Sequence, residues 1–357
     1  MRENRRRPMA RSPSTTMRAY QLLDWQRAGF GEAPVGDPGP GQVRVRIGGA
    51  GLCHSDLLFL DAPPGRWPFA LPMTLGHENA GWIDRVGPGV EGLAEGDAVL
   101  LETHWWCGRC EFCRRGADNY CARGFGRAHG VGAPGGLAPY LVTEARQCVP
   151  LGELEPIDVA PLADAGRTSY HAVKRALPKL VPGSTAVVIG VGGLGGYAVQ
   201  WLRALSPARV VAVDVHPGRL RAAEELGAEV ALRADARAAE ALRDATRGRG
   251  AEAVFDFVCS DDTLALALAS ARVLGAVALV GAGGGAARVA WETLPRDCEL
   301  WWPQGGNHPE LHEVVSLCRE RAIQHRVERF RFAETARAYE RLRAGDLPGR
   351  AVVLPSE

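Results

Sequence analysis

Hydrophobic and polar positions follow different patterns in the two parts of the chain. From residue 17 to about residue 149, short β-type runs are interrupted by glycine and proline, and few helical periods occur. Residues 42–47 alternate between apolar and charged side chains, which predicts a strand with one face toward water. We therefore expect an irregular all-β unit of short strands in this region.

Beyond residue 160, longer apolar runs alternate with segments of helical spacing. The runs predict strands at 185–190, 209–214, 253–258, 277–280 and 350–354, and the helical spacing predicts helices at 194–205, 219–226, 309–319 and 332–343. Buried strands that alternate with helices imply βαβ units and a parallel sheet covered on both faces. The chain is thus expected to combine a β domain with an α/β domain.

Composition narrows the possible functions. The 357 residues are 46% hydrophobic and 23% charged, which is typical of a globular protein. The net charge of +1 lacks the basic excess of most nucleic-acid binders, and no apolar run is long enough to span a membrane. We therefore expect neither nucleic acid nor membrane among its partners.

The first sixteen residues carry five arginines and show no apolar periodicity. This pattern predicts a disordered basic tail, or a misplaced start with Met17 as the true first residue. An export signal needs an apolar segment after its charges, and none follows here. A cytoplasmic location is the expectation.

A glycine-rich turn follows the first strand of the α/β region. Its sequence, GVGGLG at 190–195, opens the next helix, whose free N–H groups can bind a pyrophosphate. Gly190 permits the tight turn, Gly192 the approach of the phosphates, and Gly195 close contact between helix and strand. Asp214 ends the next strand, where a carboxylate can bind ribose hydroxyls and repel a 2′-phosphate. The motif favours NAD over NADP; the alternative is a glycine-rich turn without a ligand.

Four cysteines lie within fifteen residues, with the spacing C-x2-C-x2-C-x7-C. They are Cys107, Cys110, Cys113 and Cys121. Four thiolates close a tetrahedral zinc shell with no open position, which is typical of a structural site. Disulfides are disfavoured without an export signal, and an iron–sulfur cluster remains the alternative to zinc.

Three isolated residues are further candidates for metal ligands. Cys53 lies in GLCHSD, His77 in LGHE and Asp164 in PLADAG. Taken singly, each has a simpler explanation: a buried thiol, a hydrogen-bonding surface imidazole and a helix cap. Residue chemistry alone leaves these alternatives open.

Together and in this order, these motifs resemble those of the zinc-dependent medium-chain alcohol dehydrogenases. The likeness runs from about residue 17 to the C-terminus and is greatest to bacterial secondary alcohol dehydrogenases with a Cys, His and Asp zinc site. It implies a GroES-like catalytic domain over residues 17–164 and a Rossmann domain, with a doubly wound parallel sheet, over 165–305. Residues 306–357 are expected to return to the catalytic domain.

The resemblance also implies roles for individual residues. Cys53, His77 and Asp164 match ligands of a catalytic zinc, and the four-cysteine segment matches a structural zinc site, giving two zinc ions per chain. The other matched positions are Ser55 for proton transfer, Asp56 beside the ligand histidine, Glu78 near the metal, His54 near the cofactor phosphates, and Gly190, Gly192, Gly193, Leu194, Gly195, Asp214, Arg219 and Arg350 for NAD.

The implied reaction is hydride transfer between NAD and an alcohol/ketone pair in a homodimer or homotetramer. Leu58, Trp67, Phe69, Trp105 and Trp106 are expected near the substrate. The glycines at 305 and 306 leave room for a bulky secondary or aryl alcohol. The alternatives are a polyol or aldehyde dehydrogenase, a pathway-specific ketoreductase, and a non-enzymatic NAD-binding scaffold.

Overall fold

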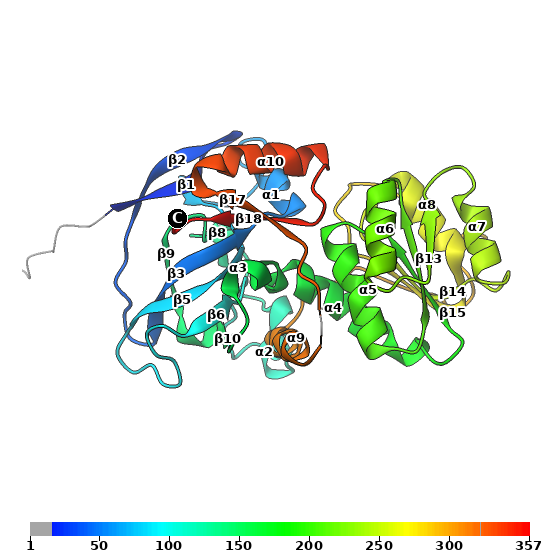
Figure 1. Cartoon of the computed structure of the whole chain (residues 1–357), viewed down its shortest axis with the longest axis horizontal. Coiled ribbons are helices and arrows are strands. Elements are labelled where there is room, and N and C mark those ends of the chain that lie inside the picture. Colours follow the sequence, from blue (N-terminus) through cyan, green and yellow to red (C-terminus); the bar gives the residue numbers. More distant parts are fainter. Residues whose placement is uncertain (1–15, 322) are drawn as a thin grey trace, which may run out of the picture.

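Two lobes make up the computed structural model of the chain (Figure 1). The structure describes residues 16–321 and 323–357, so the expected basic tail lies almost entirely outside the described residues. The first lobe is rich in β-strands and the second is an α/β layer structure. The last strand and the C-terminus lie in the first lobe (Figure 1).

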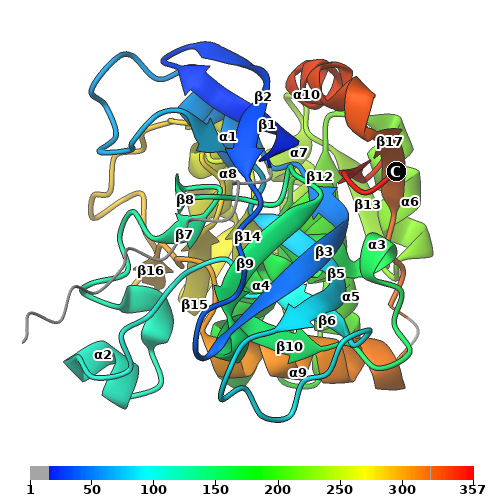
Figure 2. The same cartoon turned by 90° about the vertical axis from the view of Figure 1, so that its left-hand side faces the viewer.

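The β-rich lobe contains a seven-stranded sheet and a smaller three-stranded sheet (Figure 2). The large sheet has the order β10-β6-β5-β3-β18-β17, with β9 also paired to β3, and the small one has the order β2-β1-β4. The strands are β1 (Thr16–Asp24), β2 (Arg27–Pro34), β3 (Gln42–Gly51), β4 (Met73–Thr74), β5 (Glu78–Val86), β6 (Ala98–Leu101), β9 (Tyr140–Glu144), β10 (Cys148–Pro150), β17 (Val327–Arg331) and β18 (Arg350–Leu354), and the short pair β7 (Ala128–His129) and β8 (Gly132–Ala133) lies apart.

The alternating strand at 42–47 is β3, but only part of its polar face meets water. Arg46 is exposed, whereas Arg44 is buried because its guanidinium donates to Asp84 and Asp37 at 2.6 and 3.1 Å. The expectation of a fully wetted face was therefore wrong at Arg44, where paired acids replace water.

The second lobe is a six-stranded parallel sheet in the order β13-β12-β11-β14-β15-β16. Its elements are β11 (Thr185–Ile189), α5 (Gly193–Leu205), β12 (Arg209–Asp214), α6 (Pro217–Glu225), β13 (Val230–Arg233), α7 (Ala238–Ala245), β14 (Ala251–Asp256), α8 (Asp261–Ser270), β15 (Ala271–Leu279) and β16 (Glu299–Trp301). The strand order reverses direction between β11 and β14, and such a switch point is where doubly wound sheets bind ligands. The expected fold class is confirmed.

Several helices were not predicted from the sequence, and some of them carry site residues. They are α1 (His54–Leu60), α2 (Glu111–Arg114), α3 (Pro156–Val159), α4 (Ala165–Ala176) and the 3-10 helices η1 (Asp118–Tyr120), η2 (Ala145–Gln147), η3 (Ala160–Ala163), η4 (Leu177–Lys179) and η5 (Phe332–Glu334). Helix α1 is too short to show a periodic stripe. In α4, buried Arg167, Thr168 and Ser169 interrupt the apolar face that would reveal it. The predicted C-terminal helices are α9 (His308–Glu320) and α10 (Thr335–Ala344).

The C-terminal segment returns to the β-rich lobe. Strand β18 pairs antiparallel with β3, and α10 rests beside α1. One apolar core fills the β-rich lobe and includes Phe330 and Val353. A second core continues from that lobe through α4 and α9 into the parallel sheet, so it joins Leu100 to Val188 and Trp201.

Among residues 16–321 and 323–357, no helix is both long and apolar enough to cross a bilayer.

Candidate functional site

Four side chains from distant parts of the chain meet in one cluster. Cys53 immediately precedes α1, His77 and Glu78 lie at the start of β5, and Asp164 immediately precedes α4. One donor atom from each lies within 4.8 Å of all the others. The distance to Oδ2 of Asp164 is 3.6 Å from Sγ of Cys53 and 3.5 Å from Nε2 of His77.

These distances fit a single zinc ion. Ligands bonded at 2.0–2.3 Å in a tetrahedron lie about 3.3–3.6 Å apart, which matches the separations measured around Asp164. A thiolate, an imidazole and a carboxylate are all ligands that zinc accepts, and three protein ligands leave one position for a substrate. The residues present therefore fit the zinc expected from the sequence.

Asp56 holds the imidazole of His77. Its Oδ1 lies 2.9 Å from Nδ1 of His77, so Nε2 points toward the cluster. The same carboxylate has no exposed surface; its Oδ2 accepts bonds from the backbone N–H of Cys53 at 3.1 Å and from the Tyr339 hydroxyl at 3.2 Å. A carboxylate behind a ligand histidine is the usual support of a metal site.

Asp164 is also oriented by a neighbour on α4. The Thr168 hydroxyl donates to its Oδ1 at 2.8 Å, which leaves Oδ2 facing Cys53 and His77. Asp164 occupies the N-cap position, but its side chain makes no capping bond. The helix-cap explanation is therefore not what the structure shows. Ser55 Oγ lies 3.5 Å from His77 Nε2, at the edge of the cluster.

Glu78 and Arg350 form a buried pair between the cluster and the glycine-rich turn. The Arg350 guanidinium donates to Glu78 Oε1, which also accepts from the backbone N–H of Ala165 at 3.2 Å. Burial raises the pKa of Glu78 to about 7, although Arg350 opposes the rise. The side chain of Arg350 also lies against Gly193, where an added Cβ would be only 2.4 Å from Cδ. A single arginine thus contacts both parts of the site.

The glycine-rich turn has the geometry of a phosphate-binding loop. Gly190 has φ of +80°, a conformation that favours glycine. Gly192 is the N-cap of α5, followed by Gly193 and by Leu194, which packs on the core. A Cβ on Gly195 would lie 2.0 Å from the carbonyl oxygen of Gly190, so helix and strand approach closely there. Helix α5 begins directly after β11, at the switch point between β11 and β14, where a helix N-terminus can bind a phosphate.

Asp214 lies beside this turn at the end of β12. Its Oδ2 accepts from the backbone N–H of Val191 at 3.0 Å, and its Oδ1 accepts from that of His216 at 2.9 Å. Each carboxylate oxygen has a second lone pair for a ligand hydroxyl. The Arg219 guanidinium donates to the carbonyl of Gly345 at 2.7 Å, which fixes it near the turn.

His54 faces the same positive region. Burial lowers the pKa of its imidazole, and the charges of Arg350 and Arg219 lower it further. The structure thus brings His54 and both arginines to the side of the glycine-rich turn, where the two guanidinium charges favour an anion.

The four cysteines lie close together around α2, and we call their segment, residues 107–121, the cysteine lobe. The distance from Sγ of Cys113 is 3.4 Å to Sγ of Cys110 and 3.9 Å to Sγ of Cys107, and all four sulfurs lie within 4.8 Å of one another. A disulfide would bring two sulfurs to about 2.05 Å, whereas zinc thiolates lie about 3.8 Å apart. The geometry favours one metal ion over disulfides. Backbone N–H groups, that of Arg109 foremost, lower the pKa of Cys107 to about 6.

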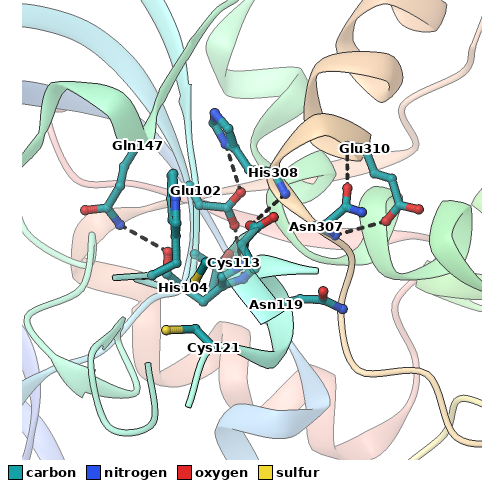
Figure 3. Close-up of polar contacts among 12 residues, drawn as sticks. Glu102, His104, Cys113, Asn119, Cys121, Gln147, Asn307, His308 and Glu310 are labelled. Carbon is teal, nitrogen blue, oxygen red and sulfur yellow. Dashed lines mark hydrogen bonds and ion pairs between the residues drawn. The ribbon is translucent and has the colours of Figure 1, made fainter. Parts of the chain in front are cut away.

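A buried polar network, which the sequence analysis missed, ties this lobe to α9 (Figure 3). Asp118 accepts from the backbone N–H of His308 at 2.9 Å and lies 3.4 Å from Nε2 of His104. Glu102 pairs with His104, His308 and the buried Arg167 of α4. No spacing in the sequence links these residues, because they come from four separate segments.

The aromatic residues expected near the substrate divide into two groups. Trp67 and Phe69 stack with ring centroids 6.0 Å apart beside α1. Leu58, which belongs to α1, is exposed. Trp106 instead lies against His308 at 4.8 Å, and the Trp105 indole N–H donates to Glu144 at 2.7 Å. Trp105 and Trp106 therefore lie beside the cysteine lobe and at its junction with α9.

Two family models match the chain. A model described as the alcohol dehydrogenase GroES-like domain matches residues 39–153, and one described as zinc-binding dehydrogenase matches residues 193–298. D-arabinose 1-dehydrogenase (NADP(+)) of Saccharolobus solfataricus is 34% identical over 90% of this chain and 92% of its own.

Solved structures give the same result over almost the whole chain. The alcohol dehydrogenase of Aeropyrum pernix has a TM-score of 0.86 at 36% identity, covering 95% of this chain and 100% of its own. Acetophenone reductase of Geotrichum candidum in complex with NAD has a TM-score of 0.84 at 28% identity, covering 97% and 99%.

The fold, the glycine-rich turn and the cluster of Cys53, His77 and Asp164, here called the mixed cluster, together define a metal-dependent dinucleotide oxidoreductase. With the matches above, the chain belongs to the zinc-dependent medium-chain alcohol dehydrogenase family. Zinc and NAD are its cofactors.

Proposed function

We propose that the chain oxidises a secondary or aryl alcohol with NAD, or reduces the corresponding ketone. The observation that carries the proposal is the convergence of Cys53, His77 and Asp164 beside the glycine-rich turn, with Arg350 in contact with both. A closed metal site would not need a nucleotide turn next to it.

In this proposal each group of the cluster has one task. Cys53, His77 and Asp164 hold the zinc, which when bound polarises an alcohol or carbonyl oxygen and lowers the pKa of the alcohol. Asp56 keeps His77 in the tautomer that presents Nε2. Ser55, within 3.5 Å of that nitrogen, accepts the alcohol proton and passes it toward solvent.

The remaining charged groups serve the cofactor. Gly192 and Gly193 present the N-terminus of α5 to the pyrophosphate, and Arg350, Arg219 and His54 surround that position. Glu78 neutralises Arg350 within the buried pair and lies close enough to the cluster for its carboxylate to approach the metal.

Asp214 supports the preference for NAD. Its oxygens are already oriented by two backbone N–H groups, so a 2′-phosphate would meet a fixed negative charge. One relative uses NADP(+) by its name, and Arg219 offers a guanidinium that could bind such a phosphate. We propose that Asp214 outweighs Arg219.

An aryl substrate is supported by the stacked rings of Trp67 and Phe69, which meet Phe59 of α1, the helix that follows Cys53, and by one structural neighbour that is an acetophenone reductase. Gly305 and Gly306 add no side-chain bulk to their own segment, and Gly305 has φ of +55°.

The direct test is a panel of primary, secondary, aryl and polyol alcohols with NAD and NADP, followed by NADH or NADPH absorbance. We expect the highest kcat/KM with an aryl or secondary alcohol and NAD, and a shift toward NADP in Asp214→Ser worth about 100-fold in the ratio. Equal use of both cofactors by the native protein would contradict the role of Asp214. Two bound zinc ions without turnover of any alcohol or ketone would instead support a scaffold.

We also propose a homo-oligomer, a dimer or a tetramer, in the cytoplasm. Strand β16 is the edge of the parallel sheet, and Leu300 and Trp302, at this edge and just beyond it, expose 37% and 73% of their surface. A sheet edge flanked by apolar side chains favours pairing with a second copy. The cytoplasmic location is supported by the unpaired thiols of the cysteine lobe.

A further inference from the structure

Two imidazoles face each other on α9, at the junction with the cysteine lobe but outside both metal clusters described above. His308 and His312 are one helical turn apart, and their Nε2 atoms are separated by 3.2 Å. His312 is exposed, whereas the side chain of His308 retains 22% of its surface. The two rings are nearly perpendicular, and their Nε2 atoms are close together at the helix surface.

The contacts of His308 determine which of its nitrogens is free. Its Nδ1 lies 3.4 Å from Oε2 of Glu102, a carboxylate with no exposed surface that also pairs with Arg167 (Figure 3). An ionised carboxylate only accepts hydrogen bonds, so Nδ1 carries the proton and Nε2 keeps its lone pair. The ring of Trp106 lies 4.8 Å away and holds the imidazole in this orientation.

The separation of the two nitrogens fits chelation of one metal ion. Imidazole nitrogens bound at 2.0–2.1 Å and at angles between a square and a tetrahedron lie about 2.9–3.4 Å apart. A ligand histidine whose other nitrogen donates to a carboxylate is the usual arrangement around a protein-bound metal. Both conditions are met at His308 and His312.

We propose that His308 and His312 form a third metal site, which takes a late first-row divalent ion such as Ni²⁺, Cu²⁺ or Zn²⁺ with water in the remaining positions. Imidazole is the preferred ligand type of these ions. The partial burial of each side chain lowers the pKa of its imidazole, which favours the neutral form that metal binding requires. Unlike the cysteine lobe, this site has two protein ligands and is open to solvent.

Metal at this site would strengthen the attachment of α9 to the cysteine lobe. Coordination at Nε2 fixes the proton on Nδ1 and therefore the contact with Glu102, which in turn holds Arg167 of α4. The ion would act on the stability of this junction and not on the reacting atoms.

The test titrates Ni²⁺ into the zinc-loaded holoenzyme by calorimetry, with metal analysis to show that both zinc ions remain. We expect one additional Ni²⁺ per chain and a rise in Tm. His312→Ala, which removes an exposed ligand without disturbing Glu102, should lose both effects. Ser316→Ala, on the same exposed face one turn further along α9, should keep them.

Two results would overturn the proposal. Equal binding of Ni²⁺ by the wild-type protein and His312→Ala would place the ion elsewhere. Absence of any additional Ni²⁺ in the wild-type protein would leave an ordinary hydrogen bond between the two imidazoles.

Discussion

The two metal clusters, one of largely buried residues and one of half-buried cysteines, hold zinc in different ways. The cysteine lobe takes all its ligands from residues 107–121, uses one donor type and is supported by backbone N–H groups of the same segment. The mixed cluster collects Cys53, His77 and Asp164 from three distant segments, and each is held by another side chain or a helix start. Local ligands make a compact closed shell, whereas dispersed ligands allow other groups to surround an open position.

This difference predicts that stability and turnover can be damaged separately, each by changes at one of the two clusters. Damage to the cysteine lobe should act on stability through one segment of the fold. Damage to the mixed cluster should act on turnover and leave the parallel sheet and its nucleotide turn intact.

The largest expected effect is that of Asp164→Ala. Removal of a ligand should reduce kcat/KM by more than about 100-fold, because even partners behind a ligand contribute 10–100-fold. NADH binding should persist, as measured by fluorescence titration, since the glycine-rich turn is unchanged. Asp164→Cys is the matched control, because it restores a zinc ligand and should recover part of the activity. Near-native activity of the alanine variant would show that Asp164 is not a ligand.

Cys110→Ser tests the other side of the comparison. We expect metal analysis to fall from two zinc ions per chain to one, together with a marked decrease in Tm, because binding of structural zinc contributes directly to folding. The folded fraction should retain its catalytic-site zinc. Unchanged zinc content would contradict the assignment of the lobe as a metal site.

Asp56→Asn is expected to have an intermediate effect. The amide can still accept from the backbone N–H of Cys53 but no longer stabilises the His77 ring as a carboxylate does. Activity or zinc affinity at the mixed cluster should fall by roughly 10–100-fold. Metal analysis after dialysis against a chelator, with the cysteine-lobe zinc as an internal reference, measures the loss.

The smallest effect concerns acid stability of the junction between the lobe and α9. Burial alone would raise the pKa of Asp118, but bonds from His104 and from the backbone of His308 outweigh it and lower the pKa. A lowered folded-state pKa stabilises the protein above the unfolded value, near 4, and this contribution disappears as the pH falls through the folded value. Tm should therefore decline below about pH 4, and the decline should be shallower in Asp118→Asn. Parallel Tm profiles of the two proteins would contradict this linkage.

The same contrast explains what the sequence could and could not predict. The cysteine spacing and the GVGGLG turn identify their sites because all the relevant residues are neighbours in the chain. Cys53, His77 and Asp164 were identified only through resemblance to a family, since no local pattern joins them. The network of Glu102, Arg167 and His308 was missed because tertiary packing alone brings its members together.

Secondary structure shows a similar limit. The central parallel strands were predicted because they are buried and largely apolar, as β11 and β14 are, whereas the more exposed edge strands β13 and β16 were not predicted. Helix α4 was not, because its polar side chains are satisfied internally: Ser169 donates to the carbonyl of Ala165, and Arg167 pairs with Glu102. In the sequence, a charged residue that forms a buried ion pair cannot be distinguished from one that faces solvent.

Arg350 has a consequence for the order in which the molecule is built. It belongs to β18, the last strand of the chain, yet it contacts both Glu78 and the turn at Gly193. During synthesis β3 can pair early with β5 and β9, whereas its third partner, β18, leaves the ribosome some three hundred positions later. A chain that ends before β18 therefore lacks both the arginine that joins Glu78 to the glycine-rich turn and the Val353 side chain in the core of the β-rich lobe, so catalysis and the folding of that lobe depend on the same last strand.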